Sequence, residues 1–292
     1  SVPQLPAGQP GQAVLCCLEK VFPPCSSMHE LLPDTCILGL AAGYHFGDVR
    51  PFLLSLERTG FQGALVLFTS ATTRDTRRMA EHGAEIRQCA RPPEMERLPW
   101  NAWRFFLYHN YLQKRSRPFR RILLTDVRDV VFQADPFSFH WPEGVCLFQE
   151  DSRVTLGQCE HTAHWVQGHL GAEALLELRD RPLLCSGTTI ADHQSMLRYL
   201  ELMTRRLLPF TPAPRMAGYD QGVHNALAWR GMFAPMHIYD NHGPVLTLGH
   251  KREPPEMDAA GMVLHESGQP ALVVHQYDRH PEAFARIRSI YT

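Results

Sequence analysis

Short apolar runs alternate with helix-forming segments along the first half of the chain. The apolar runs predict strands buried on both faces of a sheet, and they cover residues 36–42, 64–69 and 120–126. A short further strand is predicted over 84–87. The segments between them predict helices from about 48 to 59, from about 72 to 82 and over 100–115, the last because its apolar residues recur three and four positions apart. This alternation is typical of a parallel sheet with crossover helices.

The second half continues the pattern less regularly. Strands are predicted over 145–149, 183–190, 232–239 and 271–275, and helices over 196–207 and 220–229. The polar, proline-bearing stretch 249–260 is interpreted as a surface loop, with a mobile lid as the alternative. Together these elements predict an α/β fold with a mostly parallel, Rossmann-like central sheet flanked by helices.

The N-terminal residues 1–33 differ from the rest of the chain. They are rich in Pro, Gly and Ser and show no sustained period, which predicts a stem or an irregular lead-in. Residues 34–292 then form the predicted folded domain, which is long enough to bury a substantial core. The chain starts at Ser1 rather than Met, so an anchor or signal that has been removed is compatible with the sequence.

Charge and hydropathy exclude two classes of partner. The 29 basic and 30 acidic residues give a net charge of −1. This balance lacks the basic surface that binding to a nucleic-acid backbone requires. No apolar run reaches the roughly eighteen residues that a membrane-spanning helix needs. We therefore expect neither nucleic acid nor a membrane span within this chain.

The eight cysteines are scattered, with neither paired zinc spacing nor the density of a disulfide scaffold. Cys36, Cys146 and Cys185 lie in apolar runs and are expected to be buried. Three cysteines lie near the start of the chain, where disulfides could cross-link the stem of a lumenal protein. They are Cys16, Cys17 and Cys25. The sequence has no Asn-x-Ser/Thr glycosylation site. The compartment therefore stays open between the Golgi lumen and a bacterial cytoplasm.

Two carboxylates stand where the strand 120–126 ends. Asp126 is separated from Asp129 by Val-Arg, and in open α/β sheets ligands bind beyond the carboxyl ends of the strands. Carboxylates this close repel each other unless a cation lies between them, and hard divalent cations prefer oxygen ligands. Arg128 adds a planar group suited to phosphate or carboxylate. The alternative is structural, with Asp126 capping a helix and Asp129 paired with Arg128 on the surface.

The segment Leu-Leu-Thr-Asp-Val-Arg-Asp-Val-Val-Phe-Gln-Ala-Asp-Pro-Phe resembles the metal-binding segment of glycosyltransferases with the A-type fold. The resemblance spans most of residues 36–280. It includes Trp-Arg-Phe-Phe upstream, and Cys-Ser-Gly-Thr-Thr, Asp-Gln-Gly-Val-His-Asn and Val-His-Gln-Tyr-Asp downstream, in the usual order. The sequence departs from the family's Asp-x-Asp motif, since Arg128 stands at the second acidic position and the carboxylate follows one place later. No subfamily is identified.

The resemblance implies a function and a set of site residues. The expected activity is transfer of a sugar from a nucleotide diphosphate sugar, most often a UDP-sugar, to a hydroxyl acceptor such as a glycan, with Mn²⁺ or Mg²⁺. A nucleotide-binding half is expected at about 34–150 and a sugar and acceptor half at about 151–292. The expected metal ligands are Asp126, Asp129 and His275, where such a histidine is typical of retaining members. The donor-binding residues are expected to be Ala42, Gly43, Tyr44, Arg104, Asp126, Arg128 and Gly187. The residues expected to act on the sugar or acceptor are Asp220 and Gln221.

Each of these residues also has a structural interpretation. Gly187 suits a plain turn, Asp220 a helix N-cap, and Arg104 a side chain reaching solvent from an apolar helix. Tyr44, with Phe46, could stack on a nucleobase or pack locally. His275 follows a β-run that should end at the same sheet edge as Asp126, although Asp278 is an alternative ligand.

Two other functions share parts of this pattern. A sugar-nucleotide pyrophosphorylase would carry a glycine-rich phosphate loop and a basic run after the first strand, which the segment 42–47 lacks. A catalytically weak carbohydrate- or nucleotide-sugar-binding module would retain the fold without a working metal site, and the displaced Asp129 makes that alternative reasonable.

Overall fold

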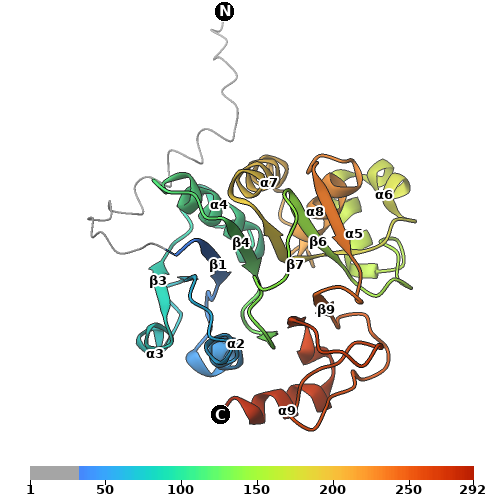
Figure 1. The fold of residues 1–292 in the computed structure, drawn as a ribbon. Helices are drawn as coiled ribbons and strands as arrows, with labels where there is room; N and C mark the ends of the chain where they lie inside the picture. Colours follow the sequence, from blue (N-terminus) through green and yellow to red (C-terminus); the bar gives the residue numbers. More distant parts are fainter. Residues whose placement is uncertain (1–32) are drawn as a thin grey trace, which may run out of the picture.

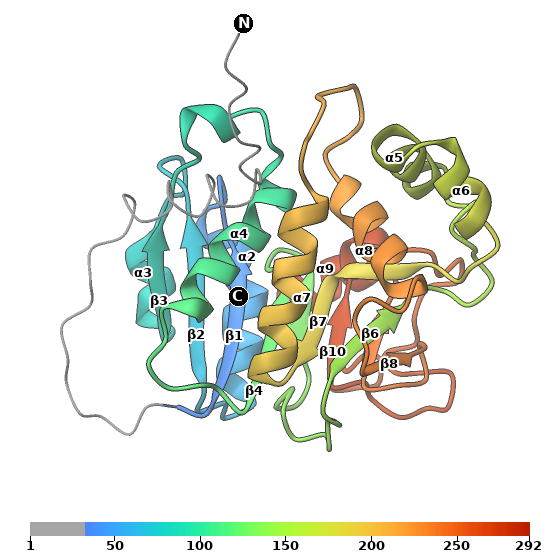
Figure 2. The same cartoon turned by 90° about the horizontal axis from the view of Figure 1, so that it is seen from above.

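A computed structural model describes residues 33–292 of the chain as a seven-stranded sheet with helices on both faces and a smaller three-stranded sheet beside it (Figures 1 and 2). The large sheet has the order β3-β2-β1-β4-β7-β6-β8 and the small one the order β5-β10-β9. The predicted stem and its three cysteines lie almost wholly outside the described residues.

The strands of the large sheet are β1 (Thr35–Leu40), β2 (Ala64–Thr69), β3 (Ala84–Gln88), β4 (Arg121–Thr125), β6 (Val145–Gln149), β7 (Leu184–Ala191) and β8 (Met236–Tyr239). The strands of the small sheet are β5 (Val130–Phe132), β9 (Val245–Thr247) and β10 (Val273–His275). All neighbours in the large sheet pair in parallel except β7, which is antiparallel to both β4 and β6. The predicted α/β class with a mostly parallel, helix-flanked sheet is confirmed.

The reversal of β7 has a consequence for the site. Because β6 is antiparallel to β7, it runs in the same direction as β4, and β8 runs parallel to β6. The carboxyl ends of β1, β4, β6 and β8 therefore meet at one edge of the sheet. Residues that follow those four strands can share a site.

Helices cover both faces of the large sheet (Figure 2). They are α2 (Phe46–Arg58), α3 (Thr76–Glu81), α4 (Trp100–Gln113), α5 (Glu160–Leu170), α6 (Ala172–Leu178), α7 (His193–Arg206), α8 (Tyr219–Trp229) and α9 (Pro281–Ile290), with short 3₁₀ turns at Pro93–Met95 and Tyr277–Arg279. Within β1, Cys36 and Leu38 pack in the core with α4 and α7, whereas Ile37 packs in the core with α2. Burial on both faces explains why the strand is continuously apolar.

The structure corrects the prediction for the last strand. Residues 271–275 were expected to end at the edge of the main sheet, but β10 belongs to the small sheet, where it is antiparallel to β5. His275 pairs in register with Val130, which directly follows Asp129. His275 therefore approaches the carboxylates through the small sheet.

Other elements were not predicted from the sequence. These are α5, α6, α9 and the strands β5 and β9. The helix α5 has few buried residues, Thr162 and Val166, so its apolar stripe is too narrow to be recognised. The strands β5 and β9 have three residues each and acquire their partners only through tertiary pairing.

The described cysteines are all buried free thiols. They are Cys36, Cys89, Cys146, Cys159 and Cys185, so the expected burial of the three in apolar runs is confirmed. No helix among residues 33–292 is long and apolar enough to cross a membrane.

Candidate metal centre and surrounding site

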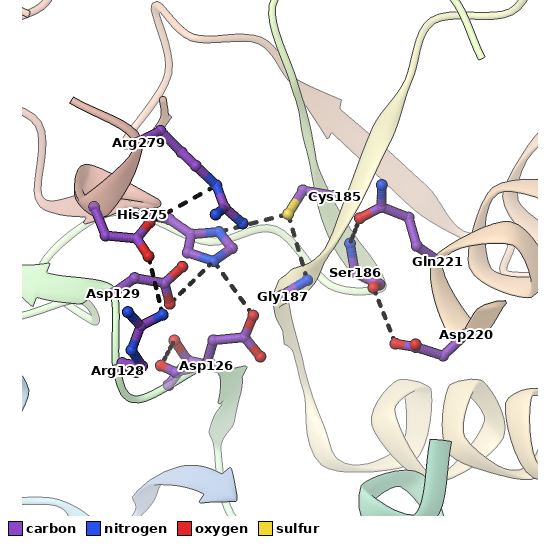
Figure 3. Close-up of polar contacts among 12 residues, drawn as sticks. Asp126, Arg128, Asp129, Cys185, Ser186, Gly187, Asp220, Gln221, His275 and Arg279 are labelled. Carbon is purple, nitrogen blue, oxygen red and sulfur yellow. Dashed lines mark hydrogen bonds and ion pairs between the residues drawn. The ribbon is translucent and has the colours of Figure 1, made fainter. Parts of the chain in front are cut away.

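Asp126 and Asp129 lie in the short connection between β4 and β5 (Figure 3). The backbone N–H of Asp126 donates to the Gly187 carbonyl at 2.8 Å, which ties the connection to β7. The carbonyl of Asp129 accepts the Gln276 N–H at 2.8 Å, which ties it to the residue after β10. No helix begins at Asp126, so the interpretation of this residue as a helix cap is wrong.

His275 completes a group of three possible metal ligands with the two carboxylates. Its Nε2 lies 3.4 Å from Asp126 Oδ2 and 3.9 Å from Asp129 Oδ1, and one ligand atom from each residue falls within 4.8 Å of the others. The His275 side chain is 1% exposed and that of Asp129 13%, whereas 36% of the Asp126 side chain is exposed. The group is therefore enclosed by protein but open on the Asp126 side.

The three groups perturb one another's ionisation. Desolvation opposes ionisation of Asp126, but the charge of Arg104 and the neighbouring imidazole of His275 outweigh it and hold the pKa of Asp126 well below its usual range. Burial, with the charges of Asp126 and Asp278, raises the pKa of Asp129 to about 6. Burial lowers the pKa of His275, but the Cys185 sulfur and both carboxylates outweigh burial and raise it well above its ordinary value.

Arg104 links Asp126 to a second buried carboxylate. Its guanidinium, on α4, forms an ion pair with Asp126 through Nη1 and with Asp220 Oδ2 through Nη2 at 3.0 Å, and donates to the Ser186 carbonyl at 3.2 Å. Arg104 is buried, so the interpretation as a solvent-reaching side chain is wrong. Its donors are engaged with protein acceptors, which is the geometry of a residue that fixes carboxylates in place.

Asp220 and Gln221 lie in the first turn of α8, against the strand β7. The helix begins at Tyr219 after Gly218, so Asp220 is not the N-cap. The Asp220 carboxylate, 2% exposed, accepts the Ser186 hydroxyl at 3.2 Å, and burial raises its pKa against the opposing charge of Arg104. Gln221 Oε1 accepts the Ser186 N–H at 3.4 Å. Both side chains thus contact the same strand as Gly187.

Gly187 lies within β7, so the interpretation as a turn glycine is wrong. A Cβ at this position would lie 2.3 Å from His275 Cε1 and 2.6 Å from Asp126 Oδ2, closer than side-chain atoms approach each other. His275 and Asp126 can therefore close over the strand only because this residue has no side chain.

Arg128 does not pair with Asp129, which overturns the surface-pair interpretation of that carboxylate. Its Nη1 lies 3.1 Å from Asp278 Oδ2 instead, and Asp278 also lies 3.8 Å from Arg279. With its charge matched by two arginines, Asp278 lies outside the group formed by Asp126, Asp129 and His275. Arg128 itself is half exposed at the same edge of the sheet.

The loop after β1 lies next to the same connection. Gly43, with φ of 80°, donates its N–H to Ser70 Oγ at 3.0 Å, which joins the loop that contains Ala42 to the end of β2. Tyr44 is partly buried, and burial together with the charges of Asp126 and Asp129 raises its pKa. Phe46 begins α2, is 3% exposed and stacks on His82, so it packs locally. Tyr44 is therefore the aromatic side chain of this loop whose ionisation the two carboxylates affect.

Two further side chains around His275 were missed at the sequence level. The Cys185 sulfur lies 3.5 Å from His275 Nδ1. The carboxylate of Glu150 is 1% exposed, and burial raises its pKa while the neighbouring Cys185 thiol opposes that rise. Glu150 directly follows β6, as Asp126 follows β4, so its place at a strand end could have been used to find it. Cys185 carried no such signal, because it resembles any small apolar residue of a buried strand.

A polar pocket of about 200 Å³ opens at the carboxyl ends of β6 and β8, on the edge that bears the carboxylates. Asp151 and Asp240, which follow these two strands closely, line it together with Arg153, Lys251 and Glu266. Arg153 pairs with Asp151 at 2.6 Å and Lys251 with Glu266 at 3.1 Å, so much of the charge is balanced within the pocket. Such a pocket suits a neutral polar ligand better than an ion.

A scan against models of protein families finds no match for this chain, and a search of curated proteins finds none. The functional conclusion therefore depends on the chemistry of the site, because a fold of this class hosts many activities.

Proposed function

We propose that this protein is a metal-dependent glycosyltransferase that moves a sugar from a nucleotide diphosphate sugar, with a UDP-sugar as the expected donor, to a hydroxyl acceptor. One observation carries the proposal. Asp126, Asp129 and His275 converge at the carboxyl edge of the sheet, and the buried His275 Nε2 has no hydrogen-bond partner there. The resemblance of the segment 123–137 to A-type transferases supports the same conclusion.

The donor set fits a divalent cation. Two carboxylates supply oxygen and His275 supplies an unpartnered ring nitrogen, a combination that suits Mn²⁺, with Mg²⁺ as the alternative through the oxygens. When bound, such a cation supplies positive charge for the diphosphate leaving group. A three-residue set leaves other coordination positions free for oxygens of the donor.

The remaining residues have roles in binding and orientation under this proposal. Arg104 fixes Asp126 relative to Asp220, and Gly187 leaves the strand β7 uncovered beside them. Ala42, Gly43 and Tyr44 border the nucleotide side, with Arg128 as a half-exposed cation for phosphate. Asp220 and Gln221 are assigned to the part of the site that takes the donor sugar. The polar pocket at the ends of β6 and β8 is the proposed place for the acceptor.

Donor hydrolysis tests this function directly. We expect slow release of the nucleoside diphosphate from at least one UDP-sugar in the presence of Mn²⁺, and loss of that release when Mn²⁺ is removed by EDTA and restored by Mn²⁺. A pyrophosphorylase would instead release a sugar 1-phosphate with pyrophosphate-dependent kinetics. Binding of the sugar nucleotide, seen as a Mn²⁺-dependent rise in melting temperature, without turnover in the presence of acceptors would identify a binding module.

The affinity for Mn²⁺ should depend on pH. A cation must displace the proton from Asp129, whose pKa is raised to about 6, and from His275, whose pKa lies well above its ordinary value. Protonation wins as the pH falls, so the dissociation constant should rise by about tenfold or more per unit between about pH 7 and about pH 5. Electron paramagnetic resonance of free Mn²⁺ measures it, and Asp129→Asn should flatten the slope. A constant affinity across this range would contradict the assigned ligands.

A further inference from the structure

His275 faces different partners with its two ring nitrogens (Figure 3). Nε2 faces the carboxylates of Asp126 and Asp129, and Nδ1 faces the Cys185 sulfur at 3.5 Å. If Nε2 is the ligand atom, Nδ1 must hold the ring proton and donate it to an acceptor on the far side of the ring. A carboxylate or a backbone carbonyl usually accepts this proton. In this protein the group in contact with Nδ1 is the Cys185 thiol.

The surroundings of the sulfur suit it to this task. Cys185 is 1% exposed, and a thiol has both a proton to donate and lone pairs that can accept. The sulfur also accepts the Gly187 N–H at 3.4 Å, which fixes its position relative to the strand. Beyond it lies the buried Glu150 carboxylate, whose Oε2 has no hydrogen-bond partner.

An irregularity in the sheet places the sulfur there. Leu147 pairs with Thr189 on β7, but the next residue, Phe148, pairs with Cys185, so the residues between them bulge out of the β6–β7 ladder. The bulge includes Gly187, whose carbonyl holds the backbone of Asp126. The same irregularity thus places the Cys185 thiol at Nδ1 of His275 and Gly187 beside the imidazole and Asp126. Bulges of this kind are common beside functional sites.

We propose that Cys185, supported by Glu150, is a positioning residue that holds His275 with Nε2 directed at the carboxylates and Nδ1 protonated. This inference rests on the proposed metal centre. The thiol accepts the Nδ1–H and donates its own proton to Glu150, so the three side chains form one hydrogen-bonded line that ends at the ligand atom. Cys185 and Glu150 do not contact the cation or the donor in this arrangement.

Exchange of Cys185 separates hydrogen bonding from packing. Cys185→Ala removes the acceptor and should weaken Mn²⁺ binding by at least about tenfold, as loss of a residue that orients a ligand commonly does. Cys185→Ser supplies a hydroxyl that both accepts and donates, and should retain affinity within about threefold of wild type. The readouts are Mn²⁺ binding followed by electron paramagnetic resonance and the visible absorption spectrum of the Co²⁺-loaded protein, which reports ligand geometry. The spectrum should change in Cys185→Ala alone.

Three further variants test whether the effect is specific to this hydrogen-bonded line rather than to stability. Cys146→Ala removes a thiol that is also fully buried, on the neighbouring strand β6, and should leave Mn²⁺ affinity unchanged. Glu150→Met has similar volume but cannot accept the thiol proton, and should weaken Mn²⁺ binding, whereas Glu150→Gln retains a carbonyl acceptor and should not. Melting temperatures recorded for each variant identify any loss of folded protein.

The outcomes distinguish this inference from the proposed function. Wild-type protein that binds no Mn²⁺ would overturn both. Equal Mn²⁺ affinity in wild type and Cys185→Ala, or equal weakening in Cys185→Ala and Cys185→Ser, would overturn the positioning role alone. Weakened binding in Cys185→Ala with rescue by serine supports the positioning role, and it does so even if no sugar donor is turned over.

Discussion

Replacement of Asp126 by alanine is expected to abolish sugar transfer, with a loss of at least about a thousandfold, and to remove Mn²⁺ binding. The carboxylate is one of three groups that converge within 4.8 Å, and it is the one most exposed to an incoming donor. Charge stabilisation by a catalytic cation contributes several kcal/mol, and about 1.4 kcal/mol corresponds to a factor of ten in rate. The rate of nucleoside diphosphate release measures the loss of transfer, and electron paramagnetic resonance of Mn²⁺ measures the loss of metal binding.

The fold should survive this substitution, because Arg104 retains Asp220 and the Ser186 carbonyl as partners. Asp135→Ala is a suitable control. This residue belongs to the same acidic segment, but its side chain accepts the Phe137 N–H rather than facing His275. We expect its activity and Mn²⁺ affinity to match wild type. Normal turnover in the Asp126→Ala protein would show that the cluster is not the catalytic centre.

Replacement of Arg104 by methionine is expected to lower the free energy of unfolding by about 3–5 kcal/mol, since breaking a buried ion pair leaves an uncompensated charge. Asp220 is 2% exposed and would keep only the Ser186 hydroxyl as a partner. Methionine approximates the length of the lost stem, so most of the cost comes from the charge rather than from a cavity. Urea unfolding measures the difference.

The dependence of this loss on pH identifies its origin. In the variant, Asp220 lacks the arginine that opposes the effect of burial, so its pKa in the folded state rises further above the unfolded value. A raised carboxyl pKa destabilises the folded protein above the unfolded pKa, and the deficit should therefore shrink as the pH falls towards about 4.

A surface arginine provides the comparison for this substitution. Arg205 pairs with Glu201 on the exposed side of α7, and both side chains are largely solvated. Its replacement by methionine should change the free energy of unfolding by less than about 1 kcal/mol. A similarly small change for Arg104→Met, or a deficit that does not depend on pH, would contradict the view of Arg104 as the buried link between two carboxylates.

The pattern of apolar and polar residues along the chain was sufficient to predict the strands that support the site. The strands β1, β2 and β4 are largely apolar runs because both of their faces are covered, and that signal is contained in the order of the residues themselves. Asp126 could be placed at the edge of the sheet for the same reason, since a carboxylate that directly follows such a run has to lie where the strand ends.

Other features were decided only by the tertiary structure. The role of Arg104 was hidden because its helix α4 is buried nearly all round, so no polar face marked where the arginine pointed. The direction of β7 has no local signature, yet it sets which strand ends share an edge. Cys185 was indistinguishable from a core residue, because its role depends on a histidine ninety positions away.

His275 shows the difference most directly. The sequence predicted that His275 lies close to the carboxylates. The strand that carries it, however, pairs with β5 in a second sheet instead of extending the first. The sequence by itself determined which residues end strands and which are continuously apolar, because these depend on neighbours along the chain. The tertiary structure decided which strands pair and which buried polar groups meet, because hydrogen bonds and ion pairs across the sheet depend on residues far apart in sequence.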